Sequence, residues 1–306
     1  MITRRNFTKT SIAGLISVPG YFSSMVNAKD VATSLKAEPF KALFAPSADM
    51  MDPELKSYKD KMQAAYDLGF RAWEDNWLAK KDLKTWEVIV EFCRDKKMQM
   101  GVSVITAGNG YDFSNLTDVQ NAKLNSQIQL GIEMVKVTGQ TFMTYVPGGR
   151  NEMKRGDQIV KAADTVKRHC DMVEEHGIIL CNEPVSHKLI KVTPMLQTFA
   201  HGHALCKVVN RKSCKLLADF YHEGEMGNGD KLVENAEAVW DEVAYVQYGD
   251  SPGRKEPGTG KLNYVKVTRW LREKGYTGII GMEHGIKKKD KQGREAMAQA
   301  YRAIDA

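Results

Sequence analysis

Cysteine is scarce in this chain, and neither proline nor glycine is enriched. The 306 residues include five cysteines, nine prolines and 25 glycines. No two cysteines have the C-x-x-C spacing, so we expect no metal site built from thiolates. An odd number of cysteines in so long a chain also argues against a disulfide-stabilised scaffold. The ordinary proline and glycine contents exclude a collagen-like fibre and a low-complexity chain.

A strong excess of one charge and a long hydrophobic run are also missing. The chain has 44 basic and 38 acidic side chains, and three of the basic ones lie in the acid-free segment 1–28. The rest is therefore nearly balanced, whereas a nucleic-acid-binding protein usually carries a basic stripe, so we expect no nucleic-acid partner. The N-terminal apolar run is too short and too interrupted to span a bilayer. With 42% hydrophobic and 27% charged residues, the composition is typical of a soluble globular protein.

Residues 1–28 have the features of an export signal. The segment Thr3–Lys9 reads TRRNFTK, and its paired arginines followed by Phe and Lys resemble the twin-arginine export motif. A weakly apolar run follows and ends in Asn27-Ala28, small residues that are typical of a signal-peptidase site. We therefore expect a cleavable twin-arginine-type signal peptide over 1–28, export to the periplasm, and a mature domain over 29–306.

Eight short apolar segments have the composition of buried strands. They recur about every 30 to 40 residues, which is the length of a strand, a helix and two connecting loops. The predicted strands are Ala42–Ala45, Arg71–Glu74, Met98–Val104, Met134–Val137, Ile178–Cys181, Lys215–Ala218, Ala244–Gln247 and Gly278–Met282.

Helical patterns lie between these strands, and their alternation predicts a parallel sheet covered by helices. Eight such units in about 270 residues match a single-domain (β/α)8 TIM barrel. A doubly wound open sheet usually has a glycine-rich phosphate loop after its first strand, but Pro46–Asp49 contains no glycine. The predicted helices are Pro53–Leu68, Leu83–Lys96, Asp118–Gly131, Gly156–Glu175, Thr193–Asn210, Leu232–Asp241 and Lys266–Gly275. We expect left-handed glycines at helix ends, namely Gly69, Gly131, Gly177 and Gly275.

Polar side chains close several of the predicted strands. In a TIM barrel the carboxyl ends of the strands converge on the active site. Clustered carboxylates repel one another unless a cation lies between them, and a set of oxygen ligands without sulfur suits Mg²⁺ or Mn²⁺. The last four strands end in Glu, Asp, Gln and Glu, namely Glu183, Asp219, Gln247 and Glu283. The sequence therefore predicts a hard divalent metal site.

One long block resembles a known family. Residues 249–264, GDSPGRKEPGTGKLNY, look like the hydroxypyruvate isomerase family, one of the xylose isomerase-like TIM barrels that also include sugar phosphate isomerases and epimerases. Three further blocks match in order, namely Glu183-Pro184, Asp219–His222 (DFYH) and Gly275–Glu283 (GYTGIIGME). The resemblance covers residues 177–284, and Gly69–Glu74 is a fainter match.

The resemblance implies roles for individual residues. It implies metal ligation by Glu183, Asp219, Gln247 and Glu283, with Glu183 and Glu283 as the acid/base pair. It implies substrate binding by His222 and Arg254, and the fainter match adds Glu74. The implied reaction takes a proton from the carbon beside a carbonyl and returns it to a neighbouring carbon through an enediolate.

The sequence thus predicts a metal-dependent isomerase or epimerase of a small hydroxy-carbonyl compound or sugar. One alternative is an exported hydrolase or lyase that acts on oxidised sugars or glycosides at the same metal site. Another is a sugar-binding barrel without activity, although both Glu183 and Glu283 are retained. The oligomeric state is left open, with a homo-oligomer as one option.

Overall fold

The computed structural model describes residues 37–108, 110–187 and 193–305. The described residues belong to one compact unit. The expected signal peptide over 1–28 and the start of the domain at residue 29 lie outside the described residues. The strands are β1 (Leu43–Ala45), β2 (Ala72–Trp73), β3 (Gln99–Met100), β4 (Ser103–Gly108), β5 (Phe142–Pro147), β6 (Ile179–Asn182), β7 (Cys214–Asp219), β8 (Val243–Tyr248) and β9 (Ile279–Met282).

The strands are all parallel and form a closed ring. Seven of them pair in the order β1-β9-β8-β7-β6-β5-β4, and β2 pairs with β3. The predicted strand Met98–Val104 corresponds to β3 followed by the start of β4, so these two pieces carry the sheet from β2 to β5. The Glu74 N–H donates to the Pro46 carbonyl across 3.1 Å and joins the end of β2 to the end of β1. The fold is therefore the predicted α/β TIM barrel.

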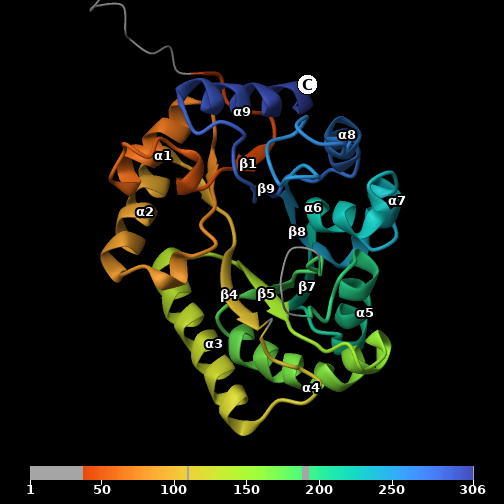
Figure 1. Ribbon diagram of the computed structural model, residues 1–306. Helices are drawn as coiled ribbons and strands as arrows, with labels where there is room; N and C mark the ends of the chain where they lie inside the picture. The colour runs from red at the N-terminus through yellow and green to blue at the C-terminus, as the bar shows by residue number, and fades with distance from the viewer. Residues whose placement is uncertain (1–36, 109, 188–192, 306) are drawn as a thin grey trace, which may run out of the picture. The chain divides into compact units, whose positions relative to one another are not determined.

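Helices surround the ring (Figure 1). A buried face on each long helix packs against the strands, as the amphipathic patterns predict. None of the helices within the described residues is long and apolar enough to cross a membrane. The helices are α1 (Tyr58–Asp67), α2 (Leu83–Lys96), α3 (Asp118–Thr138), α4 (Arg155–Glu174), α5 (Phe199–Val209), α6 (Phe220–Glu223), α7 (Leu232–Glu237), α8 (Tyr264–Glu273) and α9 (Lys291–Ile304), with short turns η1 (Ala48–Met50), η2 (Leu78–Lys80), η3 (Gly224–Asn228) and η4 (Trp240–Glu242).

The predicted strand Met134–Val137 is wrong, because these residues belong to the last turn of α3. The true strand at this point is β5, which begins five residues later. Ile128, Ile132 and Val135 are buried at the i, i+4 and i+7 spacing of a helix. A short apolar run cannot be assigned from its composition alone, and here it continues the buried stripe of the preceding helix.

Gly131 does not end a helix, as the sequence suggested, but lies within α3. A Cβ atom at Gly131 would overlap the Ile105 side chain of β4, so this glycine lets the helix approach the barrel closely. The helix instead ends at Gly139, which has a φ of 68°. Gly69, Gly177 and Gly275 do have the expected positive φ angles.

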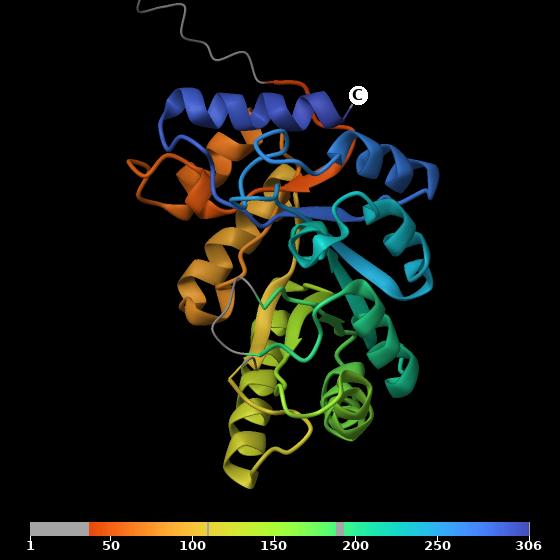
Figure 2. The same cartoon turned by 45° about the vertical axis from the view of Figure 1, so that its right-hand side comes forward.

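The C-terminal helix α9 is not among the helices predicted from the sequence. The helix lies beside β1, as both views show (Figures 1 and 2). The Asp305 carboxylate after α9 accepts the Lys41 N–H at 2.6 Å and the Ala42 N–H at 3.0 Å. The last helix is thereby fixed to the first strand of the barrel.

The five cysteines all fall within the described residues, are buried and form no disulfide. They occupy positions in the packed core or at the strand interfaces, namely Cys93, Cys170, Cys181, Cys206 and Cys214. Buried free cysteines of this kind act as small apolar residues.

Candidate active site

Three buried residues converge at the carboxyl ends of β6 and β7. Glu183 follows β6, Asp219 ends β7, and His222 lies in α6 directly after it. One ligand atom from each lies within 4.8 Å of the others. Asp219 Oδ1 accepts the Tyr221 N–H at 2.9 Å and caps α6, which leaves Oδ2 to the site.

His222 is held in one orientation by the chain after β6. The Ser186 N–H donates to His222 Nδ1 at 3.1 Å, so Nε2 carries the ring proton in the neutral form. Burial lowers the pKa of His222 to about 4, which keeps the ring neutral at pH 7. Nε2 lies 3.4 Å from Glu183 Oε1 and 3.6 Å from Asp219 Oδ2. The imidazole is therefore placed as a hydrogen-bond donor rather than a metal ligand.

Arg254 joins the carboxylates of two strands. Its Nη2 lies 2.8 Å from Asp219 Oδ2 and 3.1 Å from Glu283 Oε1, and its Nε donates to the Glu283 carbonyl at 2.8 Å. The guanidinium also lies over the Tyr221 ring, 4.9 Å from its centroid. Burial lowers the pKa of Arg254, but Glu283, Asp219 and Glu183 together raise it above its usual value. Arg254 therefore stays charged and balances the acidic groups.

The loop after β8 holds Arg254 in place and folds around a buried carboxylate. Asp250 Oδ2 accepts the N–H groups of Gly258 and Gly260, both at 2.8 Å, and Oδ1 accepts that of Leu262 at 3.0 Å. Arg254 has a φ of 49°, an uncommon value for a residue other than glycine. The block that resembles a known family is thus a loop organised by Asp250.

Burial raises the pKa of each carboxyl group that the sequence assigned to the metal. The pKa of Glu183 rises to about 7, that of Glu283 to about 7 and that of Asp219 to about 6, although Arg254 opposes all three shifts. Carboxyl groups with a pKa near neutrality can both take and give a proton at pH 7.

Gln247 lies beside these groups through the sheet register. Its Cα is paired with that of Asp219 on β7 and with that of Gly281 on β9. Gln247 Oε1 and Glu283 Oε2 are both buried and have no hydrogen-bond partner among the described residues. Buried polar atoms are normally satisfied, so these two oxygens fit the ligand positions of a divalent cation. The structure brings the four expected ligands to one end of the barrel, and their roles stay predictions.

Glu74 is also at this end of the barrel, but both its oxygens are engaged. Glu74 Oε2 accepts the Tyr245 O–H at 2.7 Å and Oε1 accepts the Gln247 amide at 2.9 Å. Its side chain is only 2% exposed. Burial raises the pKa of Glu74 well above the usual value, while the two hydrogen bonds oppose this shift.

A cavity of about 520 Å³ is lined in part by Glu74, Arg254 and Glu283, and its volume is within the usual range for small-molecule sites. Trp77, which follows β2, is 49% exposed in its wall. The wall also includes Tyr58, Glu74, Arg254, Glu283 and His284.

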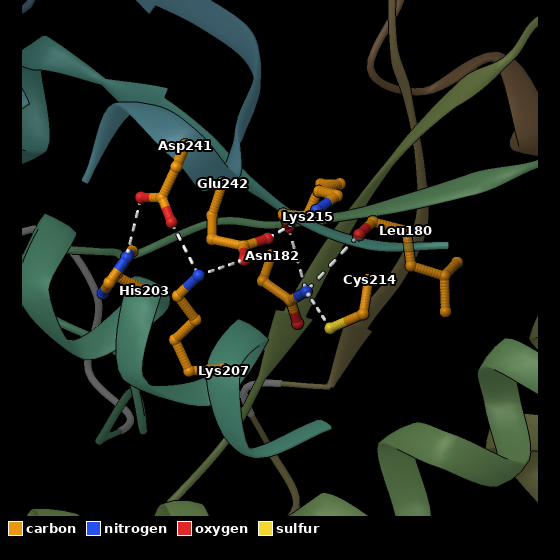
Figure 3. A network of polar contacts seen from close by, with 8 residues as sticks. All are labelled: Leu180, Asn182, His203, Lys207, Cys214, Lys215, Asp241 and Glu242. Carbon is orange, nitrogen blue, oxygen red and sulfur yellow. Dashed lines mark hydrogen bonds and ion pairs between the residues drawn. The ribbon is translucent and has the colours of Figure 1, made fainter. Parts of the chain in front are cut away.

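A polar network fixes the strands that carry Glu183 and Asp219 (Figure 3). The Asn182 amide donates to the Lys215 carbonyl at 3.0 Å and to Cys214 Sγ at 3.2 Å, linking β6 to β7. Lys215 Nζ in turn donates to Glu242 at 2.5 Å, just before β8. The network thus links the end of β6 to the amino-terminal ends of β7 and β8.

Two residues of the site were not predicted from the sequence. Asn76 lies beside Glu283 and lowers the pKa of its carboxyl group, and Tyr245 hydrogen-bonds to Glu74. Tyr245 lies two residues before Gln247, so strand alternation places both side chains on one face. That spacing is the only sequence signal for it. Asn76 lies beyond β2, where no periodicity indicates its direction.

A profile of the family described as "Xylose isomerase-like TIM barrel" matches residues 62–305, more than half of the chain. The chain belongs to this family. A putative hydroxypyruvate isomerase of Xenopus laevis is 23% identical and covers 79% of this chain and 89% of that protein. A 2-oxo-tetronate isomerase of Haemophilus influenzae is 23% identical and covers 79% and 92%. Both of these relatives are named as isomerases.

Solved structures of low sequence identity share the fold. An AP endonuclease of family 2 from Brucella melitensis has a TM-score of 0.72 at 19% identity and covers 84% of this chain and 98% of that one. The 3-keto-D-glucoside 4-epimerase of E. coli has a TM-score of 0.68 at 17% identity and covers 86% and 99%. The IOLI protein, whose structure contains a zinc atom, has a TM-score of 0.67 at 15% identity and covers 85% and 95%.

Proposed function

We propose that the protein is a metal-dependent isomerase or epimerase of a small hydroxy-carbonyl compound or sugar, with Glu183 and Glu283 as its acid/base pair. The observation that carries this proposal is the pair itself. Two glutamates from the ends of β6 and β9 lie around one charged group, Arg254, and the pKa of each is raised to about 7 by burial. The isomerases named among the relatives support the same class of reaction.

Each of these residues has its own role in moving a proton on the substrate. One glutamate removes a proton from the carbon beside the carbonyl, and the C–H electron pair moves into the enediolate. In an isomerase the other glutamate returns a proton to the former carbonyl carbon, while the hydroxyl proton passes to the former carbonyl oxygen. In an epimerase the proton returns to the opposite face of the same carbon, and neither reaction changes the mass. Arg254, fixed on Asp219 and Glu283, places a positive charge beside the developing negative charge on oxygen. The His222 Nε2–H offers a hydrogen bond from the other side.

The residues fit a divalent cation. Glu183, Asp219, Gln247 and Glu283 would hold it, and two of their oxygens have no other partner among the described residues. When bound, the ion polarises the substrate carbonyl as a Lewis acid. A donor set of carboxylate and amide oxygens favours Mg²⁺ or Mn²⁺.

A second candidate is a hydrolase or lyase that acts on oxidised sugars or glycosides at the same site. The cavity of about 520 Å³ with the Trp77 ring in its wall favours a sugar-sized compound. The E. coli structural neighbour is named for a keto-glucoside. The mass of the product separates the two candidates, because isomerisation leaves it unchanged.

The test is proton exchange followed by NMR. The protein is incubated in D₂O with Mn²⁺ and, in turn, hydroxypyruvate, ketoses and 3-keto-glycosides. With the wild type we expect deuterium to enter the substrate at the carbon beside the carbonyl. With Glu183→Gln and with Glu283→Gln this incorporation should be absent. Release of a free sugar or aglycone would establish the hydrolase or lyase. If a compound stabilises the protein against thermal unfolding but undergoes no reaction, the protein is instead a sugar-binding barrel without activity.

We also propose that the chain is exported through the twin-arginine pathway into the periplasm, on the strength of the TRRNFTK motif and of the apolar run that ends in Asn27-Ala28. Cell fractionation of the full chain tests this. We expect the Arg4→Lys/Arg5→Lys variant to stay in the cytoplasm, and an unchanged distribution would refute the proposal.

A further inference from the structure

Among the four expected ligands, Gln247 differs from the carboxylates because its side chain ends in one oxygen and one nitrogen. A glutamine amide has an oxygen that accepts and a nitrogen that donates, and only the oxygen can bind a cation. In the structure Nε2 donates to Glu74 Oε1 at 2.9 Å, while Oε1 is buried without a partner among the described residues. Glu74 therefore decides which atom of Gln247 is left for the metal.

Each hydrogen bond around Glu74 has a defined donor and a defined acceptor. The Val102 N–H, which can only donate, reaches the Tyr245 hydroxyl oxygen at 3.3 Å. The Tyr245 proton then points to Glu74 Oε2, 2.7 Å away. Because Tyr245 donates to one carboxylate oxygen, the other is left to accept from the Gln247 amide.

The barrel is shaped to admit this arrangement. A Cβ atom at Gly281 of β9 would overlap Glu74 Oε2 and lie 2.8 Å from Gln247 Cγ. A Cβ atom at Gly101, between β3 and β4, would overlap the Tyr245 hydroxyl. Two glycines thus leave room for a carboxylate that is costly to bury. Residues that orient metal ligands in this way tune metal affinity.

We propose that Glu74 is a positioning residue that holds Gln247 with its amide oxygen toward the metal, in place of the substrate contact expected from the sequence. The inference rests on the proposed function, because it requires the metal site. Tyr245 is part of the same device, since it fixes the direction of the hydrogen bonds at Glu74.

Glu74→Gln tests the proposal through metal affinity. The variant has the same shape but only one acceptor oxygen. When that oxygen accepts from Tyr245, the new NH₂ group faces Gln247, whose amide must then turn over and present its nitrogen to the ion. Titration with Mn²⁺, followed by the EPR signal of the free ion, should show a Kd about 10- to 100-fold weaker than in the wild type.

Adding Tyr245→Phe separates orientation from charge. Without the hydroxyl, the new amide oxygen is free to accept from Gln247, so Gln247 regains its orientation. We expect the double variant to bind Mn²⁺ at least about threefold more tightly than Glu74→Gln alone, although both lack the negative charge. The proposal is overturned if Glu74→Gln binds as the wild type does, or if the double variant shows no recovery.

Two controls keep this outcome distinct from that of the proposed function. If Glu283→Gln binds Mn²⁺ as tightly as the wild type, the metal site itself is refuted. If Glu283→Gln is weakened and Glu74→Gln is not, only the positioning role fails. Should Glu74→Gln not fold, anomalous diffraction from Mn²⁺-soaked wild-type crystals decides, because an ion without Gln247 among its ligands overturns the proposal.

Discussion

At the scale of single residues, the site is a set of buried acids held together by one arginine. Glu183, Asp219 and Glu283 each have a raised pKa because burial disfavours their charged forms more than Arg254 favours them. The protons that these groups retain near neutral pH compete with any cation for the same oxygens.

We therefore expect metal affinity to rise with pH. Below pH 7 the two glutamates carry protons that the ion must displace, and above it they do not. A group with a pKa of about 7 changes the apparent affinity about fivefold between pH 6 and 7, so two groups change it about thirtyfold. Mn²⁺ titrations from pH 5.5 to 8 measure this. The slope should be shallower in Glu283→Gln, and a flat profile in the wild type would contradict the pKa values.

A second prediction concerns Trp77. The Lys80 ammonium lies 3.9 Å from the centroid of its ring, which steadies an aromatic side chain that is half exposed in the cavity wall. If the substrate is a sugar ring, Trp77→Ala should raise KM about threefold to tenfold with little change in kcat, and Trp77→Phe should retain most of the affinity. For a three-carbon substrate KM should not change. Steady-state kinetics on both substrate classes distinguishes the two results.

At the scale of secondary structure, strand ends were predictable and helix boundaries were less so. The rule that barrel strands converge at their carboxyl ends located Glu183, Asp219, Gln247 and Glu283 without knowledge of their contacts. The assignment of Met134–Val137 failed because a four-residue apolar run fits a strand and a buried helix turn equally well. The hydrogen bonds of Glu74 to Tyr245 and Gln247 could not be predicted, because they join strands that lie far apart in the chain.

Gly131 gives a prediction at this scale. Gly131→Ala adds a methyl group against Ile105, whereas Gly156→Ala in α4 adds one in open space. The gain in helix propensity is at least as large at Gly131, in the middle of α3, as at Gly156, in the first turn of α4, so propensity cannot make Gly131→Ala the less stable variant. Crowding should make Gly131→Ala less stable than Gly156→Ala by about 1–3 kcal/mol. Urea unfolding of the two variants measures the difference, and equal stabilities would show that Ile105 moves aside.

At the scale of the whole molecule, individual hydrogen bonds hold β1 to its neighbours β2 and α9. The ends of β1 and β2 are joined by the hydrogen bond from Glu74 to Pro46, and α9 is fixed to β1 through Asp305. The expected metal ligands come from β6, β7, β8 and β9, so a bound ion would tie together neighbouring strands of the ring.

A cation should therefore stabilise the entire barrel. Ligand present at 100 times its Kd contributes about 2.7 kcal/mol to the free energy of unfolding, which raises the Tm of a domain of this size by about 5 to 10 °C. Thermal unfolding in EDTA and in Mn²⁺ measures the shift. Glu283→Gln should show a much smaller one, and an equal shift in both proteins would place the ion elsewhere.

The loop around Asp250 separates the placement of the charged Arg254 from the selection of the substrate. Its shape depends on its own carboxylate and glycines, and it delivers Arg254 to the acids whatever lines the opposite wall of the cavity. Substitutions around Trp77, across the barrel mouth, can therefore change which compound enters without disturbing the charge at the reacting centre.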